Sequence, residues 1–247
     1  MREISLYYLL LYFCVNLLHL ILSYYTFMIK QLLSYIYPII ISKKKSVVNG
    51  TLEVTWNNGE LVLDSKNTNY SYGSLQRILR KGLKYIGYDR IKSYKSVLVL
   101  GVAGGSVIKT LLNEIKFSGK ITGVEIDTEV INLANKYFKI NELPQVEIVN
   151  QDAFEFILKT TTTYDLIIID IFQDTKMPNF LFEEFFINKV NNHLNTNGFI
   201  LFNTMVISED DKLRNQKYKS MFGHDYSIRM YPKIEEHNEI FTIKKLR

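Results

Sequence analysis

The sequence predicts an α/β protein in which a mostly parallel sheet follows a small β-hairpin region. Three observations support this prediction. From Ser96 onward, short apolar runs alternate with amphipathic helical segments, and glycine or acidic residues follow the ends of successive runs. Residues 51–64 alternate apolar and polar side chains on both sides of an Asn-Asn-Gly turn. Repeated strand–helix units favour parallel strands joined by right-handed crossovers.

Composition narrows the class of protein. The 247 residues suffice for one medium domain with an appendage, and 47% hydrophobic with 22% charged residues is typical of globular proteins. The formal charge of +5 is mild, and no basic stripe interleaved with aromatic residues indicates nucleic-acid binding. Cys14 is the only cysteine and the four histidines show no ligand spacing. We therefore expect no disulfide, no metal and a reducing, cytoplasmic compartment.

Residues 4–29 contain no Asp, Glu, Lys or Arg, and this run is longer than the roughly 18 residues that span a bilayer. Arg2 precedes it, and Lys30 and the lysines at 43–45 follow it. No small-residue cleavage site follows, so a cleaved signal peptide is not expected. Two interpretations stay open: a membrane anchor with the following domain in the cytoplasm, or an extension upstream of a true start at Met28. The aromatic residues expected at the membrane interfaces are Tyr7, Tyr8, Tyr24 and Tyr25.

The chain divides into three expected segments: a hydrophobic N-terminal segment (1–27), a β-hairpin region (28–73) and an α/β domain (74–247). Residues 42–46 (SKKKS) read as a linker. Asn and Gly at 57–59 accept the positive φ of a tight hairpin turn. Ser74 is a plausible N-cap for the first helix of the domain, which we expect to end near residue 88.

The remaining elements follow in order from the apolar periodicity. The expected strands are 97–100, 121–124, 146–149, 166–169, 198–203 and two near 226–231 and 239–243. The expected helices between them are 107–115, 129–138, 153–158 and 182–194. Strand 166–169 is wholly apolar, as suits a strand covered on both faces. The last two strands are expected to form an antiparallel hairpin.

Four consecutive strand ends carry glycine or acid. The first strand runs into Gly101-Val102-Ala103-Gly104-Gly105-Ser106, where small residues let the backbone approach a ligand and helix N–H groups favour a polar group. Glu125 ends the second strand, where a carboxylate can accept both ribose hydroxyls of a nucleoside. Asp152 and Asp170 follow the third and fourth strands. Ligands bind at this edge of open α/β sheets, so the four positions predict a shared site.

Simpler interpretations stand beside this one. The glycines can serve a tight turn only, Glu125 can be a surface charge or a helix cap, and Asp170 can be an N-cap. Dinucleotide binding is a rival function, but the loop lacks a full G-x-G-x-x-G and the acidic positions continue through the third and fourth strands.

The series VLVLGVAGGSVIKTLL, ITGVEIDTEVINLANKYF, VEIVNQDAFEFI and YDLIIIDIFQD resembles the spermidine synthase (polyamine aminopropyltransferase) family. The upstream LEVTWNNGELVLD and NYSYGSLQRIL resemble that family's N-terminal hairpin and first helix, so the resemblance runs from about Thr51 to the C-terminus. It implies the Rossmann-like class I methyltransferase fold, with a mostly parallel seven-stranded sheet and an antiparallel last strand. It also implies a transferase that binds S-adenosylmethionine or its decarboxylated form.

The resemblance assigns roles to individual residues. Glu125 would hold the ribose, Asp152 with the backbone of Ala153 would face the adenine, and Asp170 would be the catalytic aspartate. An ammonium has no lone pair, so a carboxylate must help to remove its proton before attack. The residues implied to line the nucleoside and methionine part are Gly101, Ala103 and Gly105. The residues implied near the acceptor substrate are Tyr72, Gln173 and Asp174.

The sequence departs from the family's pattern near the amine site. The family carries an aspartate where Gly104 stands, a Tyr-His-Glu triplet where residues 72–74 read Tyr-Gly-Ser, and a second acid where Gln173 stands, with Asp174 one place late. A dication needs anionic partners at both ends, and this chain offers fewer. Three functions therefore stay open: aminopropyl transfer to a small amine, methyl transfer to an amine or another acceptor, and non-catalytic nucleoside binding. Homodimerisation is expected from the resemblance alone.

Overall fold

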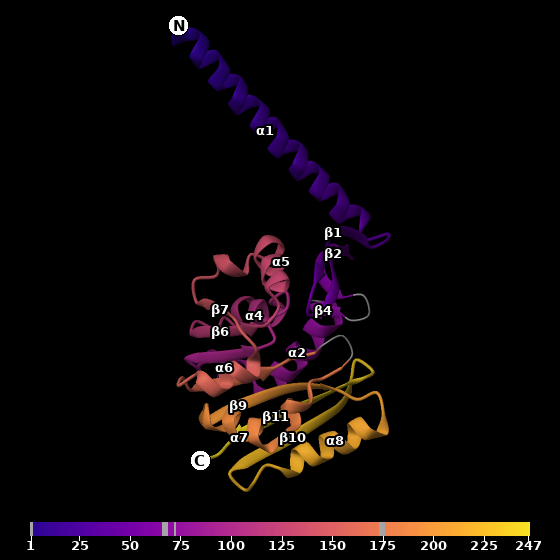
Figure 1. Cartoon of the computed structure of the whole chain (residues 1–247), viewed down its shortest axis with the longest axis vertical. Coiled ribbons are helices and arrows are strands. Elements are labelled where there is room, and N and C mark those ends of the chain that lie inside the picture. Colours follow the sequence, from indigo (N-terminus) through magenta and orange to yellow (C-terminus); the bar gives the residue numbers. More distant parts are fainter. Residues whose placement is uncertain (1, 66–68, 72, 173–175) are drawn as a thin grey trace.

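The computed structural model describes residues 2–65, 69–71, 73–172 and 176–247. Helix α1 (Arg2–Leu33) is continuous and extends away from the rest of the molecule (Figure 1). It runs through Met28 without a break, so the expected boundary between the first two segments falls inside one helix.

A small antiparallel sheet follows α1. It has the order β1-β2-β3-β4 and is formed by β1 (Ile39–Ser46), β2 (Gly50–Asn57), β3 (Glu60–Ser65) and β4 (Asn69–Ser71). The expected hairpin is confirmed, because Asn57 pairs with Glu60 and both Asn58 and Gly59 adopt positive φ. The expected linker at 42–46 is wrong. These residues form most of β1, an edge strand, where lysines discourage pairing with further chains.

Two helices lead into the main sheet, namely α2 (Gly73–Ile86) and α3 (Tyr88–Lys92). Helix α2 begins at Gly73, one residue before the expected N-cap Ser74, and ends before Gly87, whose φ of 105° no helix accommodates. One face of α2 is apolar and buried, and it is formed by Ile78, Leu79, Leu83 and Ile86.

The main sheet has seven strands in the order β10-β11-β9-β8-β5-β6-β7. The strands are β5 (Ser96–Leu100), β6 (Lys120–Glu125), β7 (Val146–Asn150), β8 (Tyr164–Ile169), β9 (Leu194–Met205), β10 (Tyr226–Ile234) and β11 (Asn238–Lys245). The run from β7 to β9 is parallel, whereas β11 is antiparallel to both of its neighbours. This confirms the expected fold.

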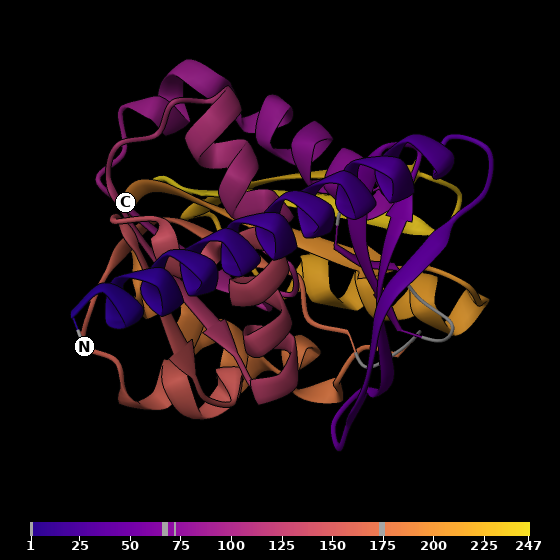
Figure 2. The ribbon, with the colours of Figure 1, turned by 90° about the horizontal axis from the view of Figure 1, so that it is seen from above.

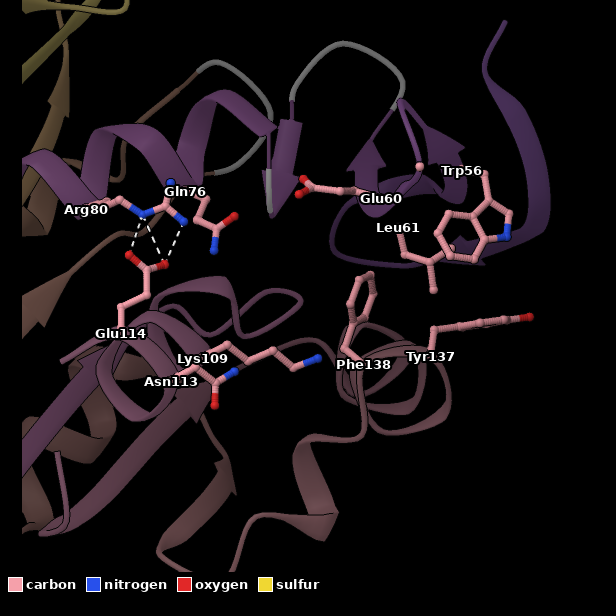
Figure 3. Close-up of a pocket in the computed structure, with 11 residues that line it drawn as sticks. Trp56, Glu60, Leu61, Gln76, Arg80, Lys109, Asn113, Glu114, Tyr137 and Phe138 are labelled. Atoms are coloured by element: carbon pink, nitrogen blue, oxygen red, sulfur yellow. Dashed lines mark hydrogen bonds and ion pairs between the residues drawn. The ribbon is translucent and has the colours of Figure 1, made fainter. Parts of the chain in front are cut away.

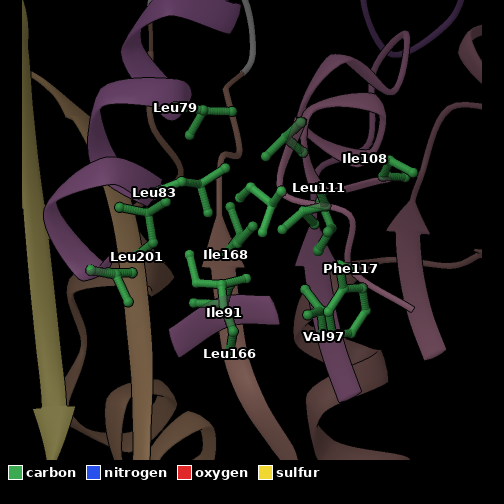
Figure 4. Packing of buried hydrophobic residues seen from close by; sticks show 14 of the residues in the cluster. Leu79, Leu83, Ile91, Val97, Ile108, Leu111, Phe117, Leu166, Ile168 and Leu201 are labelled. Carbon is green, nitrogen blue, oxygen red and sulfur yellow. The ribbon is translucent and has the colours of Figure 1, made fainter. Parts of the chain in front are cut away.

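Helices cover both faces of this sheet (Figure 2). The remaining helical elements are α4 (Ser106–Lys109) with its π-helical continuation η1 (Thr110–Glu114), α5 (Thr128–Phe138), η2 (Ile140–Glu142), α6 (Ala153–Lys159), η3 (Asn179–Phe182), α7 (Glu184–Asn192) and α8 (Glu209–Ser220). Leucine and isoleucine side chains of α2, α3 and α4 pack on one face against β5, β8 and β9 (Figure 4). Helices α6, α7 and α8 pack on the other face.

Two expectations in the second half need correction. The helix expected at 182–194 is divided, because Glu183 adopts an extended conformation between η3 and α7. Leu194 already belongs to β9, where it pairs with Tyr164 of β8. Helix α8 was not expected, since it has few apolar residues. Its sequence signal is the capping box between Ser208 and Asp211.

Candidate functional site

The carboxyl ends of four parallel strands lie side by side. The N–H of Gly101, after β5, donates to the Val124 carbonyl of β6 at 2.9 Å, and the N–H of Asp170, after β8, donates to the Leu100 carbonyl of β5 at 2.9 Å. The N–H of Gln151, after β7, donates to the Glu125 carbonyl at 3.1 Å. The crossover after β5 leads to β6 and the crossover after β8 leads to β9, in opposite directions along the sheet, so this edge contains the switch point at which open α/β sheets bind ligands.

The backbone conformation and the close packing at position 101 both favour glycine. Its φ is +87°, and a Cβ atom there would lie 2.2 Å from the carbonyl oxygen of Asp170. The loop then turns sharply, with positive φ at Ala103 and Gly105 before α4 begins. The sequence therefore places the loop backbone directly against the main chain that carries Asp170.

Glu125 is buried and organises the same loop. Its Oε2 accepts from the N–H groups of Val102 and Ala103, each at 3.1 Å, and its Oε1 accepts from the N–H of Asp127 at 3.1 Å. Burial raises the pKa of Glu125, and the three N–H donors oppose that shift. A carboxylate offers about four acceptor positions, so one position remains for a ligand hydroxyl.

Asp152 and Asp127 both cap helices. Asp152 Oδ1 accepts from the N–H groups of Phe154 (2.8 Å) and Glu155 (3.1 Å) at the start of α6, and Ala153 is the first, buried residue of that helix. Among the described residues, no hydrogen bond engages Asp152 Oδ2, which leaves an acceptor beside Glu125. Asp127 caps α5, and its other oxygen accepts from Ser46, the last residue of β1, and from Asn49.

Asp170 is partly exposed at the end of β8. Its Oδ1 accepts from Asn203 Nδ2 at 2.9 Å, and Asn203 Oδ1 accepts from Asn238 Nδ2 at 3.0 Å. Burial raises the pKa of Asp170 to about 7, the Asn203 hydrogen bond lowers it, and the charge of Glu125 raises it further. The N-cap interpretation is wrong for the described part of the chain, where the next helical turn begins at Asn179. A carboxyl that titrates near neutral pH suits a proton acceptor.

Sequence reasoning missed some residues of this site and placed others beyond what the structure describes. Asn203 and Asn238 lie inside strands rather than after them, so no strand-end pattern marks them. Ser71 of β4, whose Oγ accepts from the N–H of Ser106 at 3.2 Å, ties the small sheet to the glycine loop. The expected substrate residues Tyr72, Gln173 and Asp174 lie outside the described residues. Within the described chain, no group of three or more His, Cys, Asp or Glu side chains is arranged to hold a metal.

A cavity of about 360 Å³ lies elsewhere, between the β2–β3 hairpin, α2, η1 and α5 (Figure 3). Its residues are Trp56, Gly59, Glu60, Leu61, Gln76, Arg80, Lys109, Asn113, Glu114, Tyr137 and Phe138. Arg80 and Glu114 form a two-pronged ion pair across it, with the shortest contact at 2.6 Å. None of the residues expected from the sequence to bind nucleoside lines this cavity, so it is distinct from the sheet-edge site.

Comparison with known proteins agrees with the geometry. The family model described as "Spermine/spermidine synthase domain" matches residues 77–245. A probable polyamine aminopropyl transferase of Bifidobacterium longum is 26% identical over 190 residues, which are 72% of this chain and 42% of that protein. The chain spans about half the length of the curated relatives that it matches first.

Solved structures resemble the fold. The spermidine synthase of Thermotoga maritima superposes with a TM-score of 0.65 at 20% identity, covering 84% of this chain and 72% of that one. Human methyltransferase-like protein 13, in complex with SAH, superposes with a TM-score of 0.60 at 19% identity, covering 71% of this chain and 83% of that one. The seven-stranded architecture is thus shared by aminopropyltransferases and methyltransferases.

Proposed function

This chain belongs to the spermine/spermidine synthase family, and from that premise we propose that it transfers an aminopropyl group from decarboxylated S-adenosylmethionine to a small amine. The observation that carries the proposal is Asp170. It lies at the switch point of the sheet, beside the glycine loop, and its carboxyl titrates at about 7.

The nucleoside fits the described groups. Glu125 has one remaining acceptor position and Asp152 Oδ2 is open, which together offer acceptors for a ribose hydroxyl and an adenine amino group. Gly101 lets the loop that would hold the nucleoside lie directly against the main chain of Asp170, because a Cβ there would be 2.2 Å from the Asp170 carbonyl oxygen. The proposed reaction requires no metal.

Asp170 would act as the proton acceptor. When bound, the sulfonium supplies a carbon that an amine attacks, so that a nitrogen–carbon bond forms while the carbon–sulfur bond breaks and its electron pair stays on sulfur. The attacking nitrogen must lose one proton to give the neutral amine product, and the Asp170 carboxylate accepts that proton. Asn203 fixes the orientation of that carboxylate by donating to Oδ1. Positioning of donor and acceptor supplies much of the remaining acceleration.

Methyl transfer from intact S-adenosylmethionine is the second candidate, favoured by one observation. Gly104 stands where the family has an aspartate that would grip the amine of the aminopropyl group and repel a carboxylate. Without that charge the loop tolerates either donor.

Calorimetry with both nucleosides, followed by mass spectrometry of products formed with a diamine, distinguishes the candidates. We expect the decarboxylated form to bind and, with a diamine, to yield methylthioadenosine. Tighter binding of S-adenosylmethionine with formation of S-adenosylhomocysteine would overturn aminopropyl transfer in favour of methyl transfer. Binding with no product from either donor would identify a non-catalytic module. A chelator should leave the rate unchanged.

A further inference from the structure

Helix α1 presents apolar side chains to its surroundings along most of its length. The stretch Leu11–Leu33 has a mean hydropathy of 1.5 and none of it is buried against the protein. Leu20 is 67% exposed and Leu32 is 65% exposed. An apolar area of this size in water is strongly unfavourable, so another phase or another chain must cover it.

The distribution of apolar residues favours lipid over a protein partner. Leu17 and Leu18 are adjacent, so they point about 100° apart, and both are more than half exposed. At 100° per residue, the exposed apolar side chains cover roughly two thirds of the circumference of α1, which is wider than the single stripe of a helix pair, while Asn16, His19, Ser23, Thr26 and Lys30 share the remaining face. The uncharged residues 4–29 of α1 span about 39 Å, which suffices for a tilted crossing of the roughly 30 Å hydrocarbon core.

Two polar side chains of α1, Asn16 and Thr26, are satisfied by the helix itself. Asn16 Nδ2 donates to the carbonyl of Tyr12 at 2.9 Å, and Thr26 Oγ1 donates to the carbonyl of Leu22 at 2.8 Å. Such bonds to the preceding turn keep polar groups from facing hydrocarbon unpaired.

The C-terminal end of α1 is attached to the β2–β3 turn. The Phe27 ring packs edge-on against Trp56 at 5.0 Å between ring centroids, and Gln31 Nε2 donates to the Gly59 carbonyl at 2.9 Å. The Ser34 carbonyl accepts from the N–H of Asn58 at 3.1 Å, and Ser34 Oγ accepts from the N–H of Gly59 at 2.9 Å. These contacts fix the small sheet at the end of the helix.

Residues 35–45, which we call the interfacial segment, continue directly from this joint. Tyr35, Ile36 and Tyr37 are exposed, and amphipathic aromatic residues favour the boundary between lipid and water. The segment then enters β1, at the end of the globular part nearest α1 (Figures 1 and 2). Lys43 pairs with Glu53 at 2.6 Å, whereas in the described chain Lys44 and Lys45 contact no carboxylate.

We propose that α1 crosses a lipid bilayer and that the interfacial segment lies against anionic headgroups on the side of the α/β domain. Lysines at 30 and 43–45 flank that end of the helix, whereas Arg2 is accompanied by Glu3 at the other end. Flanking lysine and arginine favour the cytoplasmic side, so the sheet-edge site faces the cytoplasm. This inference is independent of the reaction that the site performs.

Cys14, the single cysteine, reports insertion directly, because it lies on the exposed surface of α1. The purified full-length chain is reconstituted in vesicles and treated with a membrane-impermeant maleimide. We expect Cys14 to be protected in vesicles and labelled after the vesicles are dissolved and the chain is unfolded. The variant Leu17→Asp/Leu18→Asp should insert poorly and become labelled, since each central Asp opposes insertion. Leu213→Asp, on the exposed face of α8, is the matched control, and Cys14 should remain protected from the maleimide in that variant.

Three results would overturn insertion. Equal labelling of Cys14 with and without vesicles would show that α1 remains in water. Protection of Cys14 in vesicle-free, detergent-free solution would show that a second copy of the chain covers α1. Intact mass spectrometry of the native protein that finds a chain beginning at Met28 would remove the anchor altogether.

Lysine acetylation footprinting tests the headgroup contact in the same vesicles. We expect Lys44 and Lys45 to be modified about fivefold more slowly in vesicles that contain phosphatidylserine than in phosphatidylcholine vesicles. Lys217 and Lys219, exposed on α8, are the controls and should react equally in both. Equal reactivity of all four lysines would overturn the headgroup contact and leave the lysines of β1 as protection of a sheet edge only.

Discussion

An aspartate lies at each end of strand β8, and the surroundings of the two shift their pKa values in opposite directions. At the amino end, Asp165 accepts from the N–H groups of Lys95 (2.7 Å) and Ser96 (3.1 Å) and from Asn195 Nδ2 (2.8 Å). Burial alone would raise the pKa of Asp165, but these hydrogen bonds outweigh it and the pKa is lowered. At the carboxyl end, Asp170 has only the Asn203 hydrogen bond among the described residues, and burial raises its pKa to about 7.

The contrast separates structural from chemical use of one residue type. A carboxylate with three donors is a stable anion that joins neighbouring strands. A carboxyl with one donor and little contact with water has a raised pKa. Its ionised form destabilises the folded state, but a pKa near neutral pH suits proton transfer. The hydrogen bonds of Asp165 therefore stabilise the amino edge of the sheet, whereas the proposed proton acceptor lies at the carboxyl edge.

Exchanging each aspartate for asparagine tests the contrast most strongly. Asp170→Asn should lower turnover about 10²- to 10⁴-fold, because the proton acceptor is lost, while nucleoside binding persists. Asp165→Asn should leave turnover unchanged and lower the free energy of unfolding by about 1–2 kcal/mol. Steady-state kinetics and urea titration measure both quantities. Similar losses of turnover in the two variants would contradict the assignment of Asp165 to stability and of Asp170 to the reaction.

A matched pair of glycines tests the backbone at the two edges. A Cβ at Gly101 would meet the Asp170 carbonyl oxygen at 2.2 Å, and a Cβ at Gly198 would meet the Asp165 carbonyl oxygen at 2.8 Å. Both alanine variants should be destabilised, by roughly 3 kcal/mol at Gly101, where φ is also positive, and roughly 2 kcal/mol at Gly198. Only Gly101→Ala should also weaken nucleoside binding, measured by calorimetry. Full affinity in that variant would show that the loop does not contact the ligand.

The pH profiles should differ in sign between the two ends. Asp170 has a pKa of about 7 when folded against 3.8 ordinarily, so the folded state binds more protons and the free energy of unfolding falls as pH rises from about 4 to about 7, by at most about 4 kcal/mol. The rate constant kcat/KM should rise over the same approach to pH 7 and above, as the carboxylate forms. The stabilisation by Asp165 is present above its ordinary pKa and is lost at acid pH.

The controls for these profiles are the asparagine variants. In Asp170→Asn, the free energy of unfolding should no longer fall between pH 4 and pH 7. In Asp165→Asn, the part of the free energy of unfolding that wild type loses at acid pH should be absent at every pH. A wild-type stability that stays level between pH 4 and pH 7 would contradict the raised pKa of Asp170.

The smallest effect is expected from the two asparagine donors. Asn203→Ala removes the hydrogen bond that lowers the pKa of Asp170, so the midpoint of the kcat/KM profile should move to higher pH. Asn195→Ala, which removes a donor to Asp165, should leave that midpoint in place. Each should cost about 1 kcal/mol of unfolding free energy. Equal midpoints in both variants would show that Asn203 supports the fold without positioning the carboxyl.

Strand ends proved the most informative part of the sequence. Residues that follow β5, β6, β7 and β8 could be placed on one edge because parallel strands share their direction and a glycine or acid interrupts each apolar run. The sequence places Asn203 at the end of the expected strand 198–203, but an amide there does not continue the pattern of glycine or acid at strand ends. The role of Asn203 depends on β9 lying beside β8, which is a tertiary fact.

Two elements were missed for a related reason. Strand β1 contains three consecutive lysines, which read as a linker, and only its pairing with β2 makes it a strand. Helix α8 lacks a broad apolar stripe and is buried mainly through Asn215 and Tyr218, so periodicity could not reveal it. In both cases the tertiary context outweighed the local pattern.

The position of β11 has a consequence for the order of events during synthesis. This strand lies between β9 and β10, although it leaves the ribosome after both. Its first residue, Asn238, donates to Asn203, which in turn holds Asp170. The Asp170 carboxyl, the proposed proton acceptor, therefore obtains its final support only when the hairpin of β10 and β11 has docked. A nascent chain that ends before residue 238 already contains the glycine loop and Glu125 but lacks the Asn238 donor to Asn203. The surroundings of Asp170 are therefore the last part of the site to be completed.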